Sequence, residues 1–211
     1  MNASLTTITL RQNEWTPLAH NHFYYATDGQ EAPQPTMVRL KYDEQFLYIE
    51  FECLQNPFVH QNTYRQHNTD MWNQEVFEVF IAAGQETPTR YLEIELNPNN
   101  ALFVGWIENP TLEAPENLSF VPYNMAQIEH SATMTTDSWQ GSLKLPWMLV
   151  GGKQKNFRLN FYRIVSLQPH TNPDWKGSPD DCAYLCWSPT MSGDTPRFHR
   201  PAAFGVLKLK D

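Results

Sequence analysis

The sequence predicts an all-β sandwich, and three observations support this fold class. Apolar and polar residues alternate with a period of two in several short segments, with Leu92, Ile94 and Leu96 together on one face. Turn-forming Pro, Asn, Asp and Gly residues separate these segments. No segment keeps a helical period over three turns, so long helices are not expected. The 211 residues are predicted to form a single domain over residues 1–211.

The predicted strands follow one another along most of the chain. Residues 37–41 and 46–54 form a hairpin around the polar turn at 42–45. Further strands are predicted at 75–82, 91–97, 101–107, 127–135, 138–145, 156–167, 184–188 and 204–210. A helical turn is expected at 146–152, between a proline and two glycines. Residues 108–124 and 168–181 are predicted to be long loops, and long loops often carry function.

Charge and composition exclude several classes of partner. The net charge is −8 and there is no basic run, so the protein is not expected to bind nucleic acid. The longest apolar runs are far shorter than the ~20 residues that span a bilayer. The first residues lack a basic region and a continuous apolar stretch, which predicts no signal peptide as encoded and leaves the localisation open. Neutral polyols or calcium are more compatible partners.

Polar side chains gather on one face of several predicted strands. They are Glu78 on one strand, Glu93, Glu95 and Asn97 on the next, and Arg158 and Asn160 on a later one. If these strands are neighbours, their carboxylates, guanidinium and amides form one polar face that suits the recognition of sugar hydroxyls. Two alternatives remain open, because the face can equally be solvated, or Arg158 can serve only to neutralise the carboxylates.

Three of the seven tryptophans lie at loops or strand ends, where an aromatic ring can meet a ligand. They are Trp72 before the 75–82 strand, Trp175 in the 168–181 loop and Trp187 in a late strand. An indole stacks on the apolar C–H face of a pyranose and keeps an N–H for a hydrogen bond. The alternative is that these rings cap the core.

Four stretches of sequence occur in a characteristic order. They are V-R-L-K-Y-D-E-Q-F-L-Y-I-E-F-E-C at 38–53, W-N-Q-E-V-F-E-V-F at 72–80 with Y-L-E-I-E-L-N-P at 91–98, L-N-F-Y-R-I at 159–164, and W-S-P-T at 187–190 with F-H at 198–199 and F-G at 204–205. Together they cover nearly the whole chain and resemble the family 9 carbohydrate-binding modules, part of the wider DOMON-like β-sandwich group.

This resemblance implies a jelly-roll-like antiparallel sandwich of two sheets with long loops, which binds glycans without cutting them. It implies that Trp72 and Trp187 sandwich a terminal sugar. Glu78 follows the first tryptophan by six residues, the spacing of a glutamate that contacts the sugar in such modules. The polar positions of the next strand would lie beside the sugar, although characterised modules place an Arg there where this chain has Glu.

The resemblance also implies structural calcium but no required cofactor. Asp43, Asp70 and the acid-bearing loops are candidate oxygen ligands, without the spacing of an EF-hand. His20 and His22 lie on one side of an extended segment, which suits a metal, but no third ligand is visible and surface exposure is the alternative. His199 is expected to pack against a loop and form a hydrogen bond there.

The leading hypothesis is therefore a non-catalytic carbohydrate-binding domain, with a glycoside hydrolase as a candidate partner. Its predicted ligand-binding residues are Trp72, Glu78, Glu93, Glu95, Asn97, Arg158, Asn160 and Trp187. One alternative is a small jelly-roll glycoside hydrolase that uses Glu78 with Glu93 or Glu95. Another is a structural or protein-binding sandwich whose sugar site has decayed.

Overall fold

A computed structural model describes residues 5–170, 172 and 174–210, and within them it confirms the all-β prediction. The strands are β1 (Thr7–Arg11), β2 (Thr16–Pro17), β3 (His22–Tyr25), β4 (Glu31–Tyr42), β5 (Phe46–Cys53), β6 (Val76–Ala83), β7 (Arg90–Leu96), β8 (Leu102–Glu108), β9 (Asn117–Phe120), β10 (Glu129–Met134), β11 (Trp139–Pro146), β12 (Asn156–Ser166), β13 (Cys182–Cys186) and β14 (Gly205–Lys210). The helical elements are short: α1 (Tyr123–Ala126) and 3₁₀ turns at Val59–Gln61, Met71–Asn73, Trp147–Val150 and Pro201–Ala203.

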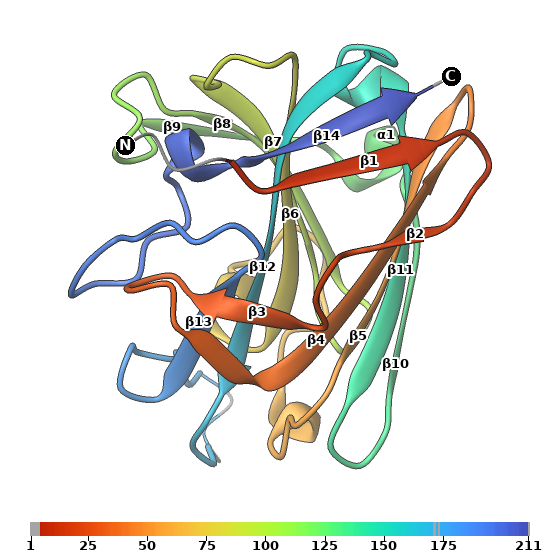
Figure 1. The fold of residues 1–211 in the computed structure, drawn as a ribbon. Helices are drawn as coiled ribbons and strands as arrows, with labels where there is room; N and C mark the ends of the chain where they lie inside the picture. The colour runs from red at the N-terminus through yellow and green to blue at the C-terminus, as the bar shows by residue number, and fades with distance from the viewer. Residues whose placement is uncertain (1–4, 171, 173, 211) are drawn as a thin grey trace.

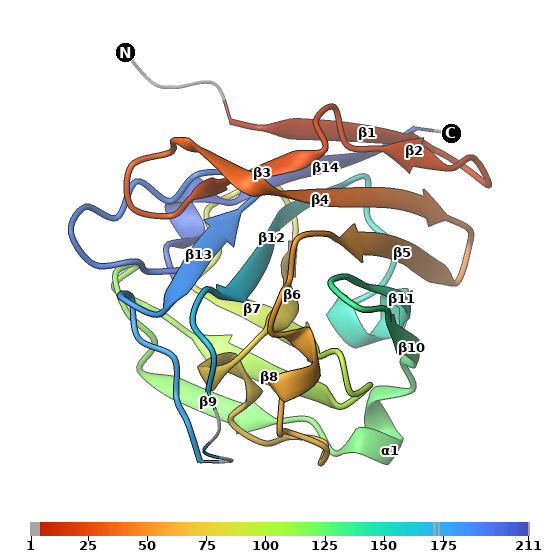
Figure 2. The same ribbon diagram turned by 90° about the horizontal axis from the view of Figure 1, so that it is seen from below.

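The strands form two layers that share the long strand β4 (Figure 1). The β5 sheet holds β10, β11, β5 and β4 in that order, with β2 also pairing with β4. The β6 sheet holds β3, β13, β12, β6, β7, β8 and β9, and β14 joins it through β12. Figure 2 shows β13, β12, β6, β7, β8 and β9 following one another on the opposite side of the molecule from β5, β11 and β10, with β3 and β4 joining the two layers. Neighbours are antiparallel except β1 and β14, which are parallel.

Strand β4 passes from one sheet to the other because its first half cannot sustain a regular ladder. Pro33 and Pro35 lack the N–H that a strand donates, so prolines are confined to edges and irregular positions. The pairing of β3 with β4 shifts register between His22 and Tyr24. From Thr36 onward β4 pairs regularly with β5 instead.

The main core lies between the two sheets. Phe77 of β6 stacks on Phe51 of β5, with ring centroids 3.8 Å apart and planes 11° from parallel. Trp139 of β11 meets the same Phe51 ring edge-on at 5.0 Å. Around these rings pack aliphatic side chains from both sheets, among them Val38, Leu40, Ile49, Val79, Ile81, Leu92, Ile94, Leu143 and Leu145. Burial of each such side chain contributes about 1.5–3 kcal/mol.

The β6 sheet is buried on its outer face as well. A second cluster there includes Phe80 of β6, Tyr91 of β7, Phe103 of β8 and Tyr162 of β12. Strands covered on both faces lose the simple alternation of buried and exposed residues, and all but the last residue of β6 is buried. The polar face predicted on these strands is therefore covered, and its reading as a solvated surface is wrong.

Some elements differ from the sequence prediction. The predicted loop at 108–124 contains strand β9, which extends the sheet beyond β8, and the turn α1. Strands β1, β2 and β3 were not predicted, because each has at most five residues, although Ile8 and Leu10 of β1 do alternate with polar residues. The hairpin of β10 and β11 and the long strand β12 are confirmed.

A buried arginine of β12 connects the two sheets. Arg163 is fully buried, and its two terminal nitrogens donate to four acceptors on β4 and the end of β5. Nη1 donates to the Pro35 carbonyl and the Thr36 hydroxyl, both at 2.9 Å. Nη2 donates to the Leu54 carbonyl and the Asn56 side chain, both at 2.8 Å.

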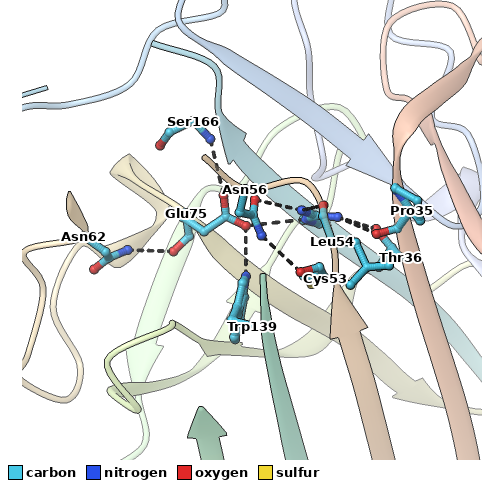
Figure 3. Close-up of polar contacts among 10 residues, drawn as sticks. Pro35, Thr36, Cys53, Leu54, Asn56, Asn62, Glu75, Trp139 and Ser166 are labelled. Atoms are coloured by element: carbon cyan, nitrogen blue, oxygen red, sulfur yellow. Dashed lines mark hydrogen bonds and ion pairs between the residues drawn. The ribbon is translucent and has the colours of Figure 1, made fainter. Parts of the chain in front are cut away.

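Glu75, just before β6, supplies the negative charge for this arginine (Figure 3). Its Oε1 lies 3.4 Å from Nε of Arg163 and accepts a hydrogen bond from the Trp139 indole at 3.1 Å. Its Oε2 accepts from the backbone N–H of Ser166. Burial raises the pKa of the Glu75 carboxyl, and Arg163 and the two donors oppose that rise. The pair is a structural ion pair on the inner face of the β6 sheet.

Replacing Arg163 with Met tests this role. The variant leaves Glu75 buried without its cation, which should lower the free energy of unfolding by about 3–5 kcal/mol in urea titrations. Arg39→Met is the matched control, because Arg39 pairs with Glu50 on the surface and such pairs contribute about 1 kcal/mol or less. Equal losses in the two variants would contradict the assignment.

Candidate functional site

A pocket of about 690 Å³ opens on the outer face of the β6 sheet. Its floor comes from the strands and holds Glu78, Glu93, Phe103, Ile107, Ile164 and Tyr184. Its walls come from Leu118 and from loop residues Trp72, Asn73, Glu113, Ala114, Pro115, Gly177, Pro196, Arg197, Phe198 and His199. The volume is in the range of small-molecule sites. Three of the eight predicted ligand-binding residues, Trp72, Glu78 and Glu93, line it.

Strand pairing brings three carboxyl groups together at this floor. Glu78 of β6 lies directly opposite Glu95 of β7, and Glu93 lies two residues along β7 on the same face. All three are buried, with 2%, 0% and 5% of Glu78, Glu95 and Glu93 exposed. The prediction that these acids share one face is confirmed.

These carboxyls lack the partners that usually stabilise a buried acid. Among the described residues no Lys, Arg or His forms an ion pair with them. Oε1 of Glu78 and both oxygens of Glu95 have no donor in the described part of the protein. Glu95 can share a hydrogen bond with Glu93 only when one of the two holds a proton.

Burial is the main reason why the pKa values of these three carboxyls are raised. It raises the pKa of Glu78 and Glu95 well above the ordinary value, and repulsion between neighbouring carboxyls adds to the rise. Burial also raises the pKa of Glu93, to about 7, although a hydrogen bond to Glu95 opposes it. These shifts favour the protonated forms, and a protonated carboxyl can donate as well as accept hydrogen bonds.

Aromatic rings form the pocket walls. Trp72 is partly exposed and meets Phe103 edge-to-face at 5.4 Å. Across the floor, Phe198 stacks on Tyr162 at 4.4 Å and meets Tyr184 edge-on at 5.8 Å. Such rings can pack against the apolar face of a ligand.

The 168–181 loop holds Trp72 in place. Trp72 belongs to the 3₁₀ turn Met71–Asn73, and the carbonyl of Asn73 accepts a hydrogen bond from Gly177 at 2.7 Å. The side chain of Gln74 donates to the carbonyl of Trp175 at 2.9 Å. Trp175 itself stacks on His170 and does not line the pocket. It therefore supports the wall rather than forming it.

The rim carries the remaining polar groups. The ring of His199 shares a hydrogen bond at 2.8 Å with the hydroxyl of Tyr91, so its partner lies on strand β7 and not on a loop as predicted. Burial lowers the pKa of His199 to about 4, so the imidazole is neutral near pH 7. Arg197 is exposed, and Glu113 lies 3.8 Å from Arg200.

Trp187 does not form the predicted second wall. It is 7% exposed and belongs to the core between the sheets, where it packs on Phe161 at 5.8 Å and against Gly205. Trp72 lies on the opposite face of the β6 sheet, so the two indoles cannot sandwich one sugar ring. The physical reason is strand alternation, because Leu185 and Trp187 face inward while Tyr184 faces the pocket.

Arg158 serves neither of the two roles predicted for it. It is 3% exposed, and its guanidinium donates to the carbonyls of Pro201, Ala202 and Phe204. It also donates to the carbonyl of Gln85 at 3.3 Å. The guanidinium thus fixes the turn before β14, and its donors are used there.

Three further predicted residues lie beside the pocket without lining it. Asn160 binds both the N–H and the carbonyl of Ser188, at 2.9 Å each. Asn97 donates to the carbonyl of Tyr64 and accepts from Ala101. The two amides therefore shape loops, and Glu95 lies fully buried beside Glu78.

Several residues of the pocket were not predicted to bind a ligand. Glu113, Arg197 and Phe198 come from loops without periodicity, so no pattern marked them. Tyr184 lies on the predicted strand at 184–188, but nothing in the sequence showed that it faces a pocket.

Asp43, one of the calcium ligands that the resemblance implies, has its oxygens engaged within the protein. Asp43 accepts hydrogen bonds from the N–H groups of Gln45 and Phe46 and from the Tyr48 hydroxyl, so its oxygens close a turn. Across residues 5–170, 172 and 174–210 no group of three or more His, Cys, Asp or Glu side chains could hold a metal ion. The rings of His20 and His22 stack on each other, and His22 pairs with Glu31.

None of the helices in the described residues is long and apolar enough to cross a membrane.

A larger groove, of about 890 Å³, lies on the outer face of the β5 sheet. Its lining mixes exposed apolar residues such as Met37 with polar ones, among them Gln140 and the pair of Arg39 and Glu50. Apart from the imidazole of His20, its aromatic side chain is Phe51, which belongs to the core and is 4% exposed. The pocket on the β6 sheet combines aromatic walls with unpartnered buried acids, so it is the stronger candidate for a ligand site.

The raised carboxyl pKa values predict a pH-dependent stability. Between the ordinary value of 4.5 and its raised folded value, Glu95 is protonated when folded and ionised when unfolded. The folded state then binds more protons, so stability falls as pH rises. Relative to wild type, Glu95→Gln should gain up to about 1.4 kcal/mol per pH unit as pH rises above the ordinary value of 4.5, measured by urea unfolding.

Glu52→Gln, which removes a carboxyl on the outer face of the β5 sheet, is the control and should show no such trend. Using differences from wild type removes the contribution of other titrating groups such as His199. A stability difference for Glu95→Gln that does not change with pH would show that Glu95 is ionised in the folded protein.

Comparison with known proteins identifies the fold. No protein-family model matches the chain. An extracellular protein of Arthroderma benhamiae (strain ATCC MYA-4681 / CBS 112371) is 29% identical over 172 residues, covering 74% of this chain and 76% of that protein. A solved structure of a candidate carbohydrate-binding protein from Bacteroides uniformis ATCC 8492 superposes with a TM-score of 0.70 at 14% identity, covering 98% of this chain and 100% of that chain.

Two solved structures of a family 9 carbohydrate-binding module from Caldicellulosiruptor kristjanssonii are also similar, each at 13% identity. The complex with glucose gives a TM-score of 0.57 and covers 97% of this chain and 95% of that chain. The complex with cellotriose gives 0.54 and covers 97% and 93%. At these identities the likeness concerns the fold, and this chain has the β-sandwich fold of the family 9 carbohydrate-binding modules.

Proposed function

We propose that this protein binds carbohydrate, a sugar or the end of a glycan, in the pocket on the outer face of the β6 sheet. The observation that carries the proposal is the combination of a partly exposed indole, Trp72, with the buried carboxyls of Glu78 and Glu93 in one pocket. The ring would stack on a pyranose face, and the carboxyls would bind hydroxyls. The fold shared with modules solved with glucose and cellotriose supports the same ligand class.

The raised pKa values of the carboxyls at the pocket floor favour ligand binding over cleavage of a glycosidic bond. A retaining or inverting glycosidase needs one ionised carboxylate beside one protonated acid. The pKa values of Glu78 and Glu95 are raised and no cation among the described residues offsets the rise, so both suit hydrogen bonding better than nucleophilic attack. Glu93, whose pKa is raised to about 7, is the acid of the three that can supply an ionised carboxylate, and the assay for reducing sugar below tests that role. A glycoside hydrolase acting on the same glycan is the partner that such a binding function would serve.

Calorimetric titration with glucose, cellobiose and cellotriose tests the proposal. Wild-type protein should bind at least one of these ligands, and Trp72→Ala should weaken that binding about tenfold or more, because stacking and apolar burial are lost. Trp15→Ala is the matched control, since Trp15 lies on the β5 sheet side against Arg39 and Lys41. Its binding should equal that of wild type.

The Trp187→Phe variant distinguishes a core role of Trp187 from the proposed ligand-binding role of Trp72. The phenyl ring keeps an aromatic group in the core, so binding should be retained while stability falls modestly. Binding lost equally in Trp187→Phe and Trp72→Ala would restore the sandwich of two indoles. Release of reducing sugar that disappears in Glu78→Gln would establish a hydrolase instead.

A further inference from the structure

The acids at the pocket floor are not neutralised by the protein. Glu78, Glu93 and Glu95 lie on one sheet face, and the two buried arginines of β12 are used elsewhere. Arg158 binds the carbonyls before β14, and Arg163 lies on the opposite face of the sheet. Burying three carboxyls without a cation lowers the stability of the folded protein, because a buried charge needs a partner.

Such a cluster is stabilised either by holding protons or by receiving a cation. Oε1 of Glu78 has no donor in the described residues, although the side chain lines the pocket and is only 2% exposed. The described residues do not converge as a metal site, so a metal ion is not the fitting cation. A protonated amine fits better, because it offers three directed N–H donors on a carbon skeleton that the walls can hold.

The walls suit an organic cation as well. The rings of Trp72, Tyr184 and Phe198 line the same pocket as the carboxyls. Aromatic faces attract ammonium groups, most strongly where water is excluded. Arg197 at the rim is the opposing charge, but it is exposed and water screens it, whereas the carboxyls are buried.

We propose that the preferred ligand carries a protonated primary amine, as an amino sugar at the end of a glycan does. The inference rests on the proposed carbohydrate-binding function and narrows its ligand class. The sugar ring packs on Trp72 while its ammonium group donates to Glu78 and Glu93. A neutral sugar can use the same wall but leaves the acid floor uncompensated.

Amine binding has a second signature, which is release of a proton. A cation over the floor favours the ionised form of Glu93, so protons leave as the ligand enters. The other titratable or charged groups around these carboxyls are Asp70, Tyr91, Glu113, Tyr162, Tyr184, Arg197 and His199. Burial keeps the three hydroxyls and the imidazole neutral near pH 7, so they do not compete as the source of the proton.

The test compares three β-1,4-linked trisaccharides of equal length, built from glucosamine, N-acetylglucosamine and glucose. Calorimetry is run at about pH 6, where both the ligand amine and Glu93 are mostly protonated before binding, so that ionisation of Glu93 gives net release. It uses two buffers of different ionisation enthalpy and is repeated at raised salt to suppress non-specific attraction to the net charge of −8. The glucosamine ligand should bind about tenfold tighter than the glucose ligand, with net proton release to the buffer. Acetylation, which removes the charge, should abolish the advantage.

Glu93→Gln and Glu78→Gln should each reduce the preference for the amine, and Glu52→Gln, the same change outside the pocket, should keep it. Circular dichroism checks that each variant is folded, and the wild-type ligand series decides the question even if one variant is not. Glucose binding as tight as glucosamine binding overturns the inference and leaves carbohydrate binding intact. A preference for the amine that survives in both pocket variants also overturns it. Absence of binding to all three ligands overturns the proposed function itself.

Discussion

The buried ion pair of Arg163 and Glu75 fixes how the two sheets meet, and the pocket depends on it. Arg163 donates to two acceptors on β4, two in the loop after β5 and a fifth on Glu75, so neither charge is buried without partners. Because Arg163 must face inward, alternation turns Ile164, the next residue of β12, toward the outer face. The adjacent strand β6 turns Glu78 the same way, so one inward contact determines which side chains form the pocket floor.

Covering the outer face of the β6 sheet changes the chemistry of its acids. On an exposed sheet face, Glu78, Glu93 and Glu95 would be ordinary ionised surface groups. Loops close over them here, and the loss of water raises their pKa values and leaves their oxygens without protein donors. The protein thereby carries polar groups that a ligand can satisfy, at some cost to its own stability, which is a common property of binding sites.

Alternation and turn residues predicted much of the fold, but they predicted only part of the candidate ligand site. Strands β4 to β8, the hairpin of β10 and β11, and β12 are long enough to show a period, and that period placed Glu78, Glu93 and Glu95 on one face. It could not show which face of β13 is the core, because Tyr184 and Trp187 are both aromatic and have opposite parity. Nor could the period show that the Arg158 guanidinium donates hydrogen bonds to carbonyls of residues more than forty positions later in the chain. Loop walls such as Phe198 carry no period at all.

The position of the ligand is the central claim, and a crystal structure of the protein with a bound oligosaccharide tests it most directly. The account predicts one sugar ring lying on Trp72, with its polar groups within hydrogen-bonding distance of Glu78 and Glu93. A sugar bound in the groove on the outer face of the β5 sheet, beside Glu52 and Gln140, would contradict it.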